Sequence, residues 1–301
     1  MVRLGQGVWM QVHLIDGTYE LFRHFFPIPS HLNSEGEEVA ATRAVVGNLL
    51  KLLEDEATHV GVATDHVVVS WRNQLWADYK TGDGMDPDIL SQFPLLEGAL
   101  TAAGFVVWPM IDDEADDALA AAATMAALDE RVSQVKICTA DKDLAQCVLD
   151  PLIIQVDRRK RVELDEAAVI EKYGVPPTSI PDWLALVGDS ADGFPGVQGW
   201  GAKSAASVLQ RYLHIEQIPS APGQWDVTVR GAAKLSASLE AAREKAHLFK
   251  QLATLNLDAP VSATVDELEW VEPTSEFTSW CERLDAPGLL ATAERLAAKR
   301  S

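Results

Sequence analysis

Short apolar runs alternate with longer amphipathic segments through the first half of the chain. The apolar runs have the length of buried β-strands, and they are Val12–Ile15, Val60–Ala63, Phe105–Trp108, Val135–Thr139 and Leu152–Val156. The segments between them carry apolar residues at helical spacing, and several open on acids that suit a helix N-terminus: Glu38–Glu56, Ile89–Ala103, Asp113–Glu130, Asp141–Val148 and Asp165–Lys172. This alternation predicts an α/β fold with a mostly parallel sheet flanked by helices.

The alternation stops near residue 174. The sequence Gly174-Val175-Pro176-Pro177-Thr178 cannot continue a helix and indicates a boundary. Beyond it the pattern is helical, in residues 231–257 and 276–299, with a loop expected over Ile218–Gly223. We therefore predict an α/β domain over residues 1–174 and a smaller helical domain over residues 175–301.

Composition narrows the class of protein. With 301 residues, of which 48% are apolar, the chain can bury a sizeable core. Residues 1–15 contain neither a cleavage site nor an apolar run that spans a bilayer, so a cytoplasmic protein without a membrane contact is expected. The three cysteines lack metal-type spacing and predict reduced, mostly buried thiols. The net charge of −20 disfavours nucleic acid, so any contact with DNA requires local basic patches.

Carboxylates follow three of the predicted strands at their ends. They are Asp16, Asp65, Asp141 and Asp143. In open α/β sheets, the carboxyl ends of the strands are where ligands bind. Taken alone, Asp141 and Asp143 are better explained as the cap of the next helix.

A further acidic cluster, Glu114, Asp116 and Asp117, occupies the first turn of a predicted helix, where the helix dipole alone explains it. If the strand ends and this helix start share one edge of the sheet, each like-charge pair at ~5 Å costs roughly 3 kcal/mol at an effective dielectric of 20. Hard oxygen ligands without nearby His or Cys select Mg²⁺ or Mn²⁺, and two such ions can flank a scissile phosphate. The constellation predicts phosphodiester hydrolysis.

A second acidic pair, Asp189 and Asp192, lies past the boundary, and a Gly-rich segment over 196–206 follows it. Glycines let backbone N–H groups approach a phosphate, and Lys203 can pair with it. A plain turn and a helix–turn–helix scaffold explain these features equally well when each is taken alone. Their linkage favours binding to a DNA backbone.

In this order and along nearly the whole chain, the residues resemble the 5′-nuclease superfamily. That superfamily includes the 5′→3′ exonuclease domain of bacterial DNA polymerase I, the phage 5′ nucleases and the flap endonucleases. The matching motifs are Ile15-Asp16-Gly17, Asp65, Trp71-Arg72, Tyr79-Lys80, Asp113-Glu114-Ala115-Asp116-Asp117, Thr139-Ala140-Asp141-Lys142-Asp143-Leu144, Gly188-Asp189-Ser190-Ala191-Asp192, Pro195-Gly196-Val197 and Gly199-Trp200-Gly201-Ala202-Lys203.

The resemblance implies a PIN-like sheet domain followed by a helical domain with a helix–hairpin–helix element at about residues 182–213. It implies two metal sets. The first is Asp16, Asp65, Glu114 and Asp116 with Asp117 close by, and the second is Asp141, Asp143, Asp189 and Asp192. It also implies that a metal-bound water attacks the phosphorus in line while the ions stabilise the leaving oxygen.

The same resemblance assigns catalytic roles. Lys80 is expected to stabilise the transition state, and Arg72 is expected to position the DNA strand. Asp141 is expected to take part in catalysis as a metal ligand. Tyr79 either stacks on a base or packs in the core. The DNA-binding hairpin, which can also hold K⁺ in this family, is expected to use Gly196, Gly199, Gly201, Lys203 and Ser204. The basic run Arg158-Arg159-Lys160-Arg161 is better explained as a hairpin turn than as a DNA contact.

The chain departs from the family pattern in three places. Asp83 stands where the family has a basic residue, in a loop of the arch that embraces single-stranded 5′ DNA, which alters the expected balance of exonuclease and flap cleavage. Gly193 follows Asp192 where the family usually has asparagine. Residues 1–9 precede the family's usual start, so Met10 is a candidate initiator.

We therefore expect a monomeric, structure-specific 5′ nuclease that acts on DNA with a 5′ flap, nick or 5′ end, in replication and repair. Because the sequence ends at Ser301 without a polymerase domain, a separate polymerase and ligase are the expected partners. Two alternatives stay open. Residues 188–203 argue against a PIN-type ribonuclease, and the full carboxylate set argues against a catalytically silent junction-binding protein.

Overall fold

The computed structural model describes residues 10–55 and 57–300, and the chain divides into two compact units. Unit 1 combines the described residues up to Val67 with Gly84–Thr139 and the residues from Leu257 onward, and unit 2 combines Val68–Asp83 with Ala140–Asn256. Because each unit joins separate stretches of chain, the domain boundary at residue 174 stays a prediction. The alternative start at Met10 concerns residues 1–9, which lie outside the described residues.

Parallel strands form the centre of unit 1. They lie in the order β3 (Val106–Met110), β2 (His59–Asp65), β1 (Met10–Asp16) and β4 (Val132–Cys138). β2 is buried along its whole length and β1 from Val12 onward, as expected of parallel strands covered on both faces. The predicted mostly parallel sheet and its strands are confirmed.

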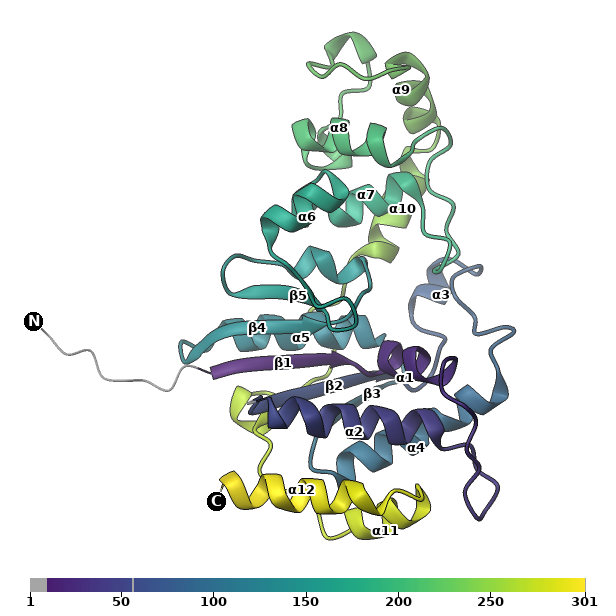
Figure 1. Cartoon of the computed structure of the whole chain (residues 1–301). Helices are drawn as coiled ribbons and strands as arrows, with labels where there is room; N and C mark the ends of the chain where they lie inside the picture. Colours follow the sequence, from purple (N-terminus) through teal and green to yellow (C-terminus); the bar gives the residue numbers. More distant parts are fainter. Residues whose placement is uncertain (1–9, 56, 301) are drawn as a thin grey trace, which may run out of the picture. The chain divides into compact units, whose positions relative to one another are not determined.

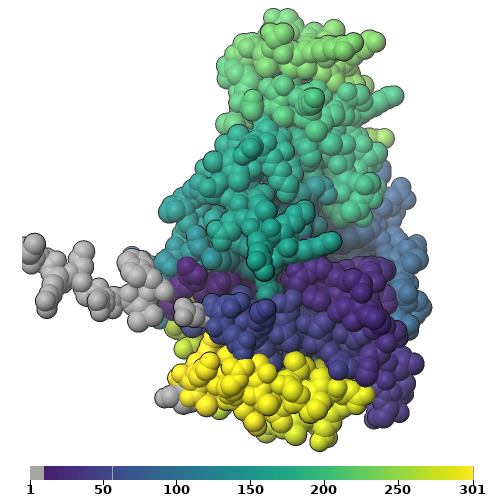
Figure 2. Space-filling view, viewed as in Figure 1, coloured from purple at the N-terminus to yellow at the C-terminus, as the bar shows by residue number. Residues whose placement is uncertain are grey.

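Helices cover both faces of this sheet (Figure 1). α5 (Ala115–Ala127) packs on all of these strands, and its alanines allow a close approach. α1 (Gly17–Phe25), α2 (Ala40–Glu54) and α4 (Pro87–Ala102) form the opposite layer. The C-terminal helices α11 (Phe277–Arg283) and α12 (Pro287–Arg300) pack against α4 and α2, respectively. In Figure 2 the yellow atoms of the C-terminal region lie against the dark blue atoms of the region that contains α2. A 3₁₀ turn, Val265–Leu268, contacts β2.

Unit 2 is mostly helical and has a core of its own. Its antiparallel hairpin pairs β5 (Ile153–Asp157) with β6 (Val162–Leu164), which confirms the turn predicted for the basic run between them. Its α-helices are α3 (Arg72–Leu75), α6 (Glu166–Tyr173), α7 (Ile180–Val187), α8 (Ala202–Tyr212), α9 (Ala232–Ala241) and α10 (Arg243–Ala253). Its short 3₁₀ segments include Pro177–Ser179, Ile215–Gln217 and Pro222–Gln224.

One predicted helix is wrong. Asp141–Val148 was expected to be α-helical, whereas the structure has a 3₁₀ helix over Asp143–Cys147. The Asp143 N–H donates to Oδ1 of Asp141 at 2.9 Å, and this side-chain bond closes a tighter turn before the segment. α1 was not predicted, although Asp16 caps it by accepting the N–H of Tyr19.

Two smaller expectations concern membranes and thiols. Within residues 10–55 and 57–300, no helix combines the length and the apolar character needed to cross a membrane. Cys138 and Cys281 are buried, Cys147 is partly buried, and all three are reduced thiols, as predicted.

Asp182, in the first turn of α7, anchors unit 2. Its buried carboxylate accepts the N–H of Ile215 at 2.8 Å, lies 2.9 Å from His214 Nδ1, and lies 2.9 Å from the ammonium of Lys250. Replacing Asp182 by alanine leaves the buried N–H of Ile215 and the ammonium of Lys250 without this acceptor. We expect Asp182→Ala to lower the free energy of unfolding by about 3 kcal/mol, measured by urea denaturation.

The matched control removes an exposed carboxylate of the same unit. Asp226, half exposed, pairs with the exposed Arg211 at 2.5 Å. Solvent screens such a pair, so Asp226→Ala is expected to change stability far less than Asp182→Ala. Equal losses in the two variants would contradict the anchoring role of Asp182.

Candidate metal centre and nucleic-acid interface

The carboxylates predicted as the first metal set lie in unit 1, where β1 and β2 end and α5 begins. Asp16 ends β1; its Oδ1 accepts the N–H of Tyr19 at 2.8 Å, and its Oδ2 accepts the hydroxyl of Thr139 at 2.7 Å. Asp65 ends β2, and its Oδ1 accepts the N–H of Ala115 at 2.9 Å. The contacts place both strand ends beside other predicted site elements, as the parallel register requires.

Glycine makes the close approach of the two strand ends achievable. A Cβ on Gly17 would lie 2.8 Å from the carbonyl oxygen of Ala63 and 2.7 Å from Cγ2 of Thr64. The turn from β1 into α1 therefore rests directly on the end of β2. Any larger residue at position 17 would push Asp16 away from Asp65.

The start of α5 supplies the remaining acids of this set. Glu114 is the N-cap residue, and Oδ2 of Asp117 accepts its N–H at 3.0 Å in a capping box. Glu114 and Asp117 are buried, whereas Asp116 is half-buried. The carboxylate of Asp117 is engaged in capping the helix, and its place beside the metal ligands stays a prediction.

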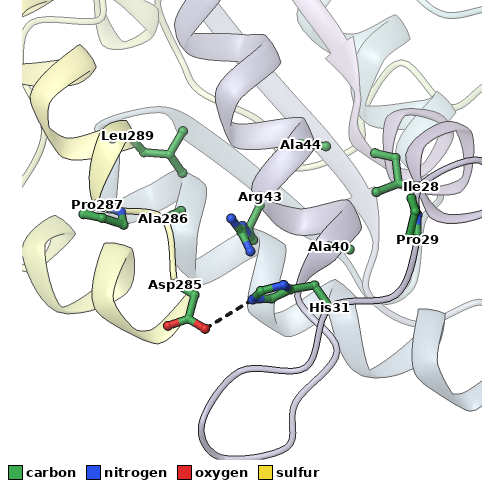
Figure 3. A pocket seen from close by; sticks show the side chains of 11 residues that line it. Ile28, Pro29, His31, Ala40, Arg43, Ala44, Asp285, Ala286, Pro287 and Leu289 are labelled. Atoms are coloured by element: carbon green, nitrogen blue, oxygen red, sulfur yellow. Dashed lines mark hydrogen bonds and ion pairs between the residues drawn. The ribbon is translucent and has the colours of Figure 1, made fainter.

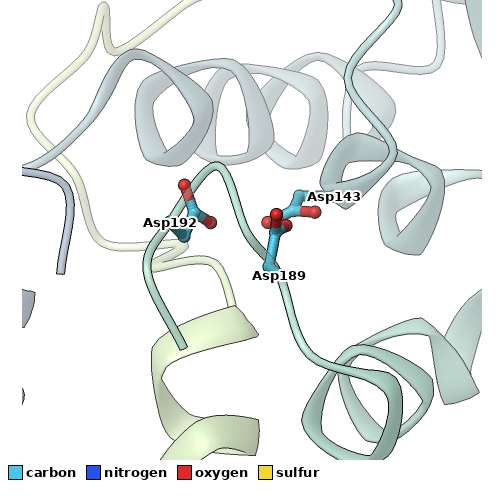
Figure 4. Close-up of side chains that lie close together, drawn as sticks. All are labelled: Asp143, Asp189 and Asp192. Carbon is cyan, nitrogen blue, oxygen red and sulfur yellow. The ribbon is translucent and has the colours of Figure 1, made fainter. Parts of the chain in front are cut away.

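The second set gathers in unit 2. Asp143, Asp189 and Asp192 each offer a carboxylate oxygen, and these atoms lie within 4.8 Å of one another (Figure 4). Asp189 and Asp192 belong to a loop after α7 that is closed by the N–H of Phe194, which donates to the carbonyl of Asp189 at 3.0 Å. Asp141 is exposed and enters this set through its hydrogen bond to the Asp143 backbone. The structure thus brings three of the four predicted ligands together.

Neighbouring carboxylates of the second set shift the pKa of Asp143 and of Lys142. Burial raises the pKa of Asp143 well above its usual value, and the neighbouring carboxylates of Asp141, Asp192 and Asp189 raise it further. Burial alone would lower the pKa of Lys142, but the surrounding carboxylates outweigh it and the pKa is raised. Lys142 therefore stays positively charged among acids that repel one another.

This donor set fits a divalent cation. Oδ1 of Asp143 is buried and accepts no hydrogen bond from the described part of the chain. Asp143, Asp189 and Asp192 all present carboxylate oxygens, which are the ligands preferred by Mg²⁺ and Mn²⁺. A shallow hollow of about 470 Å³, lined in part by Gly188, Asp189 and Ser190, opens beside them.

The basic and aromatic residues expected near the phosphate lie on the segment that contains α3. Arg72 is only 1% exposed, and its guanidinium donates to the carbonyls of Leu252 at 2.7 Å and Thr254 at 3.2 Å. This geometry favours a structural role over the strand-positioning role, which stays a prediction. Tyr79 is 2% exposed and belongs to the core of unit 2, which favours the packing alternative.

Lys80 is half-buried, and its backbone is held in place. Asn73 Nδ2 donates to the carbonyls of Tyr79 at 3.1 Å and Lys80 at 3.3 Å. Since Tyr79 is fixed in the core, the Cα of Lys80 has little freedom. Its assignment to transition-state stabilisation stays a prediction, and the anchored backbone suits it.

The segment before Lys80 lies directly against the acidic loop of unit 2. Trp76 Nε1 donates to the carbonyl of Gly193 at 3.1 Å, and a Cβ on Gly193 would lie 2.1 Å from the carbonyl oxygen of Asp78. Gly193 also has a φ of +78°, which disfavours other residues. The departure from the family's Asp-Asn pattern therefore accompanies a close backbone contact.

We expect Gly193→Ala to lower the free energy of unfolding by about 3 kcal/mol, because the new Cβ combines backbone strain with a clash against Asp78. Gly231 is the matched control, since its φ is +79° and a Cβ there meets nothing within 4 Å. Gly231→Ala should cost only about 1 kcal/mol. Denaturant unfolding measures both, and equal losses would show that the contact with Asp78 adds nothing.

The Gly-rich hairpin precedes α8. A Cβ on Gly199 or Gly201 would meet nothing within 4 Å, and Lys203 is exposed, so a phosphate can reach this backbone. Ser204 has a local task, because its Oγ accepts the N–H of Gly201 at 3.0 Å in a capping box. Gly196 differs from the others, since a Cβ there would lie 2.4 Å from the Gly188 nitrogen, which indicates a packing role.

A separate pocket of about 610 Å³ lies in unit 1 (Figure 3). Arg43 points into it, and His31 pairs with Asp285 at 3.2 Å across its rim. None of the predicted site residues, all of which lie in the described ranges, lines this pocket. It takes no part in the centre described above.

Two family models match the chain. The 5′-3′ exonuclease N-terminal resolvase-like domain covers residues 11–174, and the 5′-3′ exonuclease C-terminal SAM fold covers residues 175–276. The chain therefore belongs to the 5′-3′ exonuclease family.

Relatives agree with this placement. The 5′-3′ exonuclease of Aquifex aeolicus is 29% identical over 288 residues, which cover 95% of this chain and 96% of that protein. The DNA polymerase I of Pseudomonas aeruginosa is 34% identical over 273 residues, or 87% of this chain, and that of Bacillus caldotenax is 31% identical over 289 residues, or 91%. The chain spans 29% and 32% of the lengths of these polymerases.

Solved structures share the fold. The zinc-bound T5 5′-exonuclease superposes with a TM-score of 0.64 at 16% identity, covering 97% of this chain and 100% of that one. The catalytic core of Rad2 in complex with DNA substrate has a TM-score of 0.61 at 13% identity, covering 96% of this chain and 93% of that one. At these identities the likeness establishes the α/β fold with its helical addition.

Proposed function

We propose that this chain is a metal-dependent, structure-specific 5′ nuclease that hydrolyses DNA phosphodiesters at 5′ flaps, nicks or free 5′ ends during replication and repair. One observation carries the proposal. Asp143, Asp189 and Asp192 converge within 4.8 Å, and a buried oxygen of Asp143 has no hydrogen-bond partner within the described residues, on a chain of the 5′-3′ exonuclease family.

Each unit contributes one carboxylate set to this proposal. Mg²⁺ or Mn²⁺ is the proposed cofactor because the donors are hard oxygens, and when bound such ions activate water and stabilise charge on the leaving oxygen. Asp117 and Thr139 orient the first set through hydrogen bonds to the Glu114 backbone and to Asp16. The proposed ligands are Asp16, Asp65, Glu114 and Asp116 in unit 1, and Asp141, Asp143, Asp189 and Asp192 in unit 2.

The DNA is proposed to bind through its backbone. Gly199, Gly201 and Lys203 offer an exposed phosphate-binding hairpin, which reads structure and carries no base readout. K⁺ at this hairpin stays a prediction. Asp83, in the acidic loop before α4, would repel a threaded 5′ strand and shift the balance between exonuclease and flap cleavage.

Other parts of the proposal concern the setting of the enzyme. We propose a cytoplasmic monomer that works beside a separate DNA polymerase and ligase, because 5′-end removal leaves a gap or nick for those reactions. Size-exclusion chromatography coupled to light scattering tests the oligomeric state directly.

One experiment tests the activity. The chain is incubated with a 5′-labelled flap duplex, single-stranded DNA and RNA, with Mg²⁺, Mn²⁺ or EDTA, alongside Asp141→Ala. Flap cleavage that requires metal and is lost in the variant supports the proposal. Absence of flap cleavage with either metal overturns it, cleavage of RNA alone supports a PIN-type ribonuclease, and metal-independent flap binding without cleavage supports a junction-binding protein.

A further inference from the structure

Lys142 places a positive charge inside the second carboxylate set. Its Nζ lies 2.5 Å from Oδ2 of Asp189 and 4.0 Å from Oδ1 of Asp143. These carboxylates, with Asp192, are the ones whose oxygens converge within 4.8 Å. The ammonium thus contacts the same acids that a divalent cation would use.

The position of Lys142 in the chain brings it there. It lies between Asp141 and Asp143, immediately before the first residue of the 3₁₀ helix, and the hydrogen bond between these two aspartates fixes the turn. The Lys142 side chain is 32% exposed, and its flexible stem can swing toward solvent without disturbing the core. The ammonium of Lys142 can therefore move away from the carboxylates.

The ammonium and a divalent cation oppose each other at this set. An ion coordinated by Asp189 and Asp143 would be close to Nζ, and like charges repel strongly where burial limits screening. With neither cation near them, the converging carboxylates repel one another instead. Lys142 therefore stabilises the carboxylate set when no divalent ion is bound, and its positive charge disfavours binding of that ion.

We propose that Lys142 is the resident counter-cation of the second carboxylate set, and that a divalent cation binds this set by displacing the ammonium from Asp189. This inference rests on the proposed function and adds a form of regulation to it. The exchange sets the concentration of divalent ion at which the set fills. Lys142 acts through the ligands, so it is a positioning residue.

The test measures Mn²⁺ binding to the full chain by electron paramagnetic resonance. Lys142→Met is expected to bind Mn²⁺ roughly tenfold more tightly than the wild type, on the scale by which neighbours of ligands change metal affinity. Lys142→Arg keeps the charge and should bind like the wild type. Lys234→Met removes an exposed lysine of α9 and controls for the change in net charge.

Thermal unfolding gives a second readout. In EDTA, Lys142→Met should unfold at a lower temperature than the wild type, and Mn²⁺ should raise its unfolding temperature by a larger amount. Lys142→Gln keeps a hydrogen-bond donor without the charge, and it serves if the methionine variant does not fold in EDTA. If Lys142→Met folds only when Mn²⁺ is present, that result would itself support the inference.

Unchanged or weaker Mn²⁺ binding in both Lys142→Met and Lys142→Gln overturns the inference. Asp189→Asn, measured in parallel, separates this failure from that of the proposed function. If Asp189→Asn does not weaken Mn²⁺ binding, the metal assignment falls and the inference falls with it. If it weakens binding while the Lys142 variants match the wild type, the inference alone falls.

Discussion

Replacing Asp189 by asparagine is expected to lower the single-turnover rate of flap cleavage roughly 10³-fold. Asp189 is 4% exposed and belongs to the converging set with Asp143 and Asp192. Its Oδ1 accepts the N–H of Ala191 at 3.0 Å, a bond that the asparagine oxygen can keep. The substitution therefore removes the ligand charge while the loop geometry is retained.

The control for this loss of cleavage rate is a carboxylate of unit 2 that lies outside the second carboxylate set. Asp165 caps α6 by accepting the N–H of Ala168 at 2.8 Å, and Asp165→Ala should leave the cleavage rate unchanged. Circular dichroism and thermal unfolding check that both variants are folded. Cleavage by Asp189→Asn within tenfold of the wild type would show that this carboxylate is not a metal ligand in the reaction.

The sheet and the position of the first set were predictable from sequence because buried parallel strands are continuous apolar runs. The runs Val12–Ile15 and Val60–Ala63 are each followed by a carboxylate within two residues, and the parallel register then brought Asp16 and Asp65 to the same edge. No long-range information was needed for that step. The elements after residue 174 were recognisable only as helical, since amphipathic patterns do not say which helices pack together.

Interactions between distant segments could not be predicted. The sequence predicts that Arg72 positions the DNA strand, yet the carbonyl that accepts the Nε–H of Arg72 belongs to a residue 180 positions later. The contact of Gly193 with Asp78 has the same character, because a glycine in a loop has many explanations until the neighbouring backbone is seen. Burial of a polar group is decided by tertiary packing, which one-dimensional patterns do not contain.

Two residues that contact the proposed metal ligands were not singled out from the sequence, although signals for them were present. Lys142 was noted only as part of a motif, but a lysine between two predicted metal ligands is an unusual neighbour for a cation site. Thr139 directly follows β4, and its hydroxyl donates to Asp16. Asking which groups satisfy each predicted carboxylate would have identified both.

The overall charge of −20 was the least informative feature for function. Many of the carboxylates behind this charge have local partners: they accept hydrogen bonds from neighbouring backbone N–H groups, cap helices or belong to the proposed metal sets. Few cations are therefore left to act on the scissile phosphate, and the effect of removing one of them on the cleavage rate should be large. Lys80 is the cation for which this reasoning gives the strongest expectation.

Lys80→Ala is expected to lower the single-turnover cleavage rate roughly 10²-fold to 10³-fold while DNA binding weakens only slightly. Its backbone is fixed by Asn73, and the adjoining residues 76–79 lie against the loop that carries Asp189 and Asp192. A cation presented from a rigid backbone stabilises developing charge without reorganising in the transition state. Single-turnover kinetics and fluorescence anisotropy with a flap duplex separate the rate from the affinity.

Two variants make this expectation specific to a positive charge at position 80. Lys80→Arg retains the charge and should recover much of the rate, and Lys234→Ala removes an exposed lysine of α9 and should match the wild type. A parallel fall in rate and affinity in Lys80→Ala would instead assign Lys80 to ground-state DNA binding. A rate within threefold of the wild type would remove Lys80 from the reaction and leave the carboxylate sets to stabilise the transition state through their metals alone.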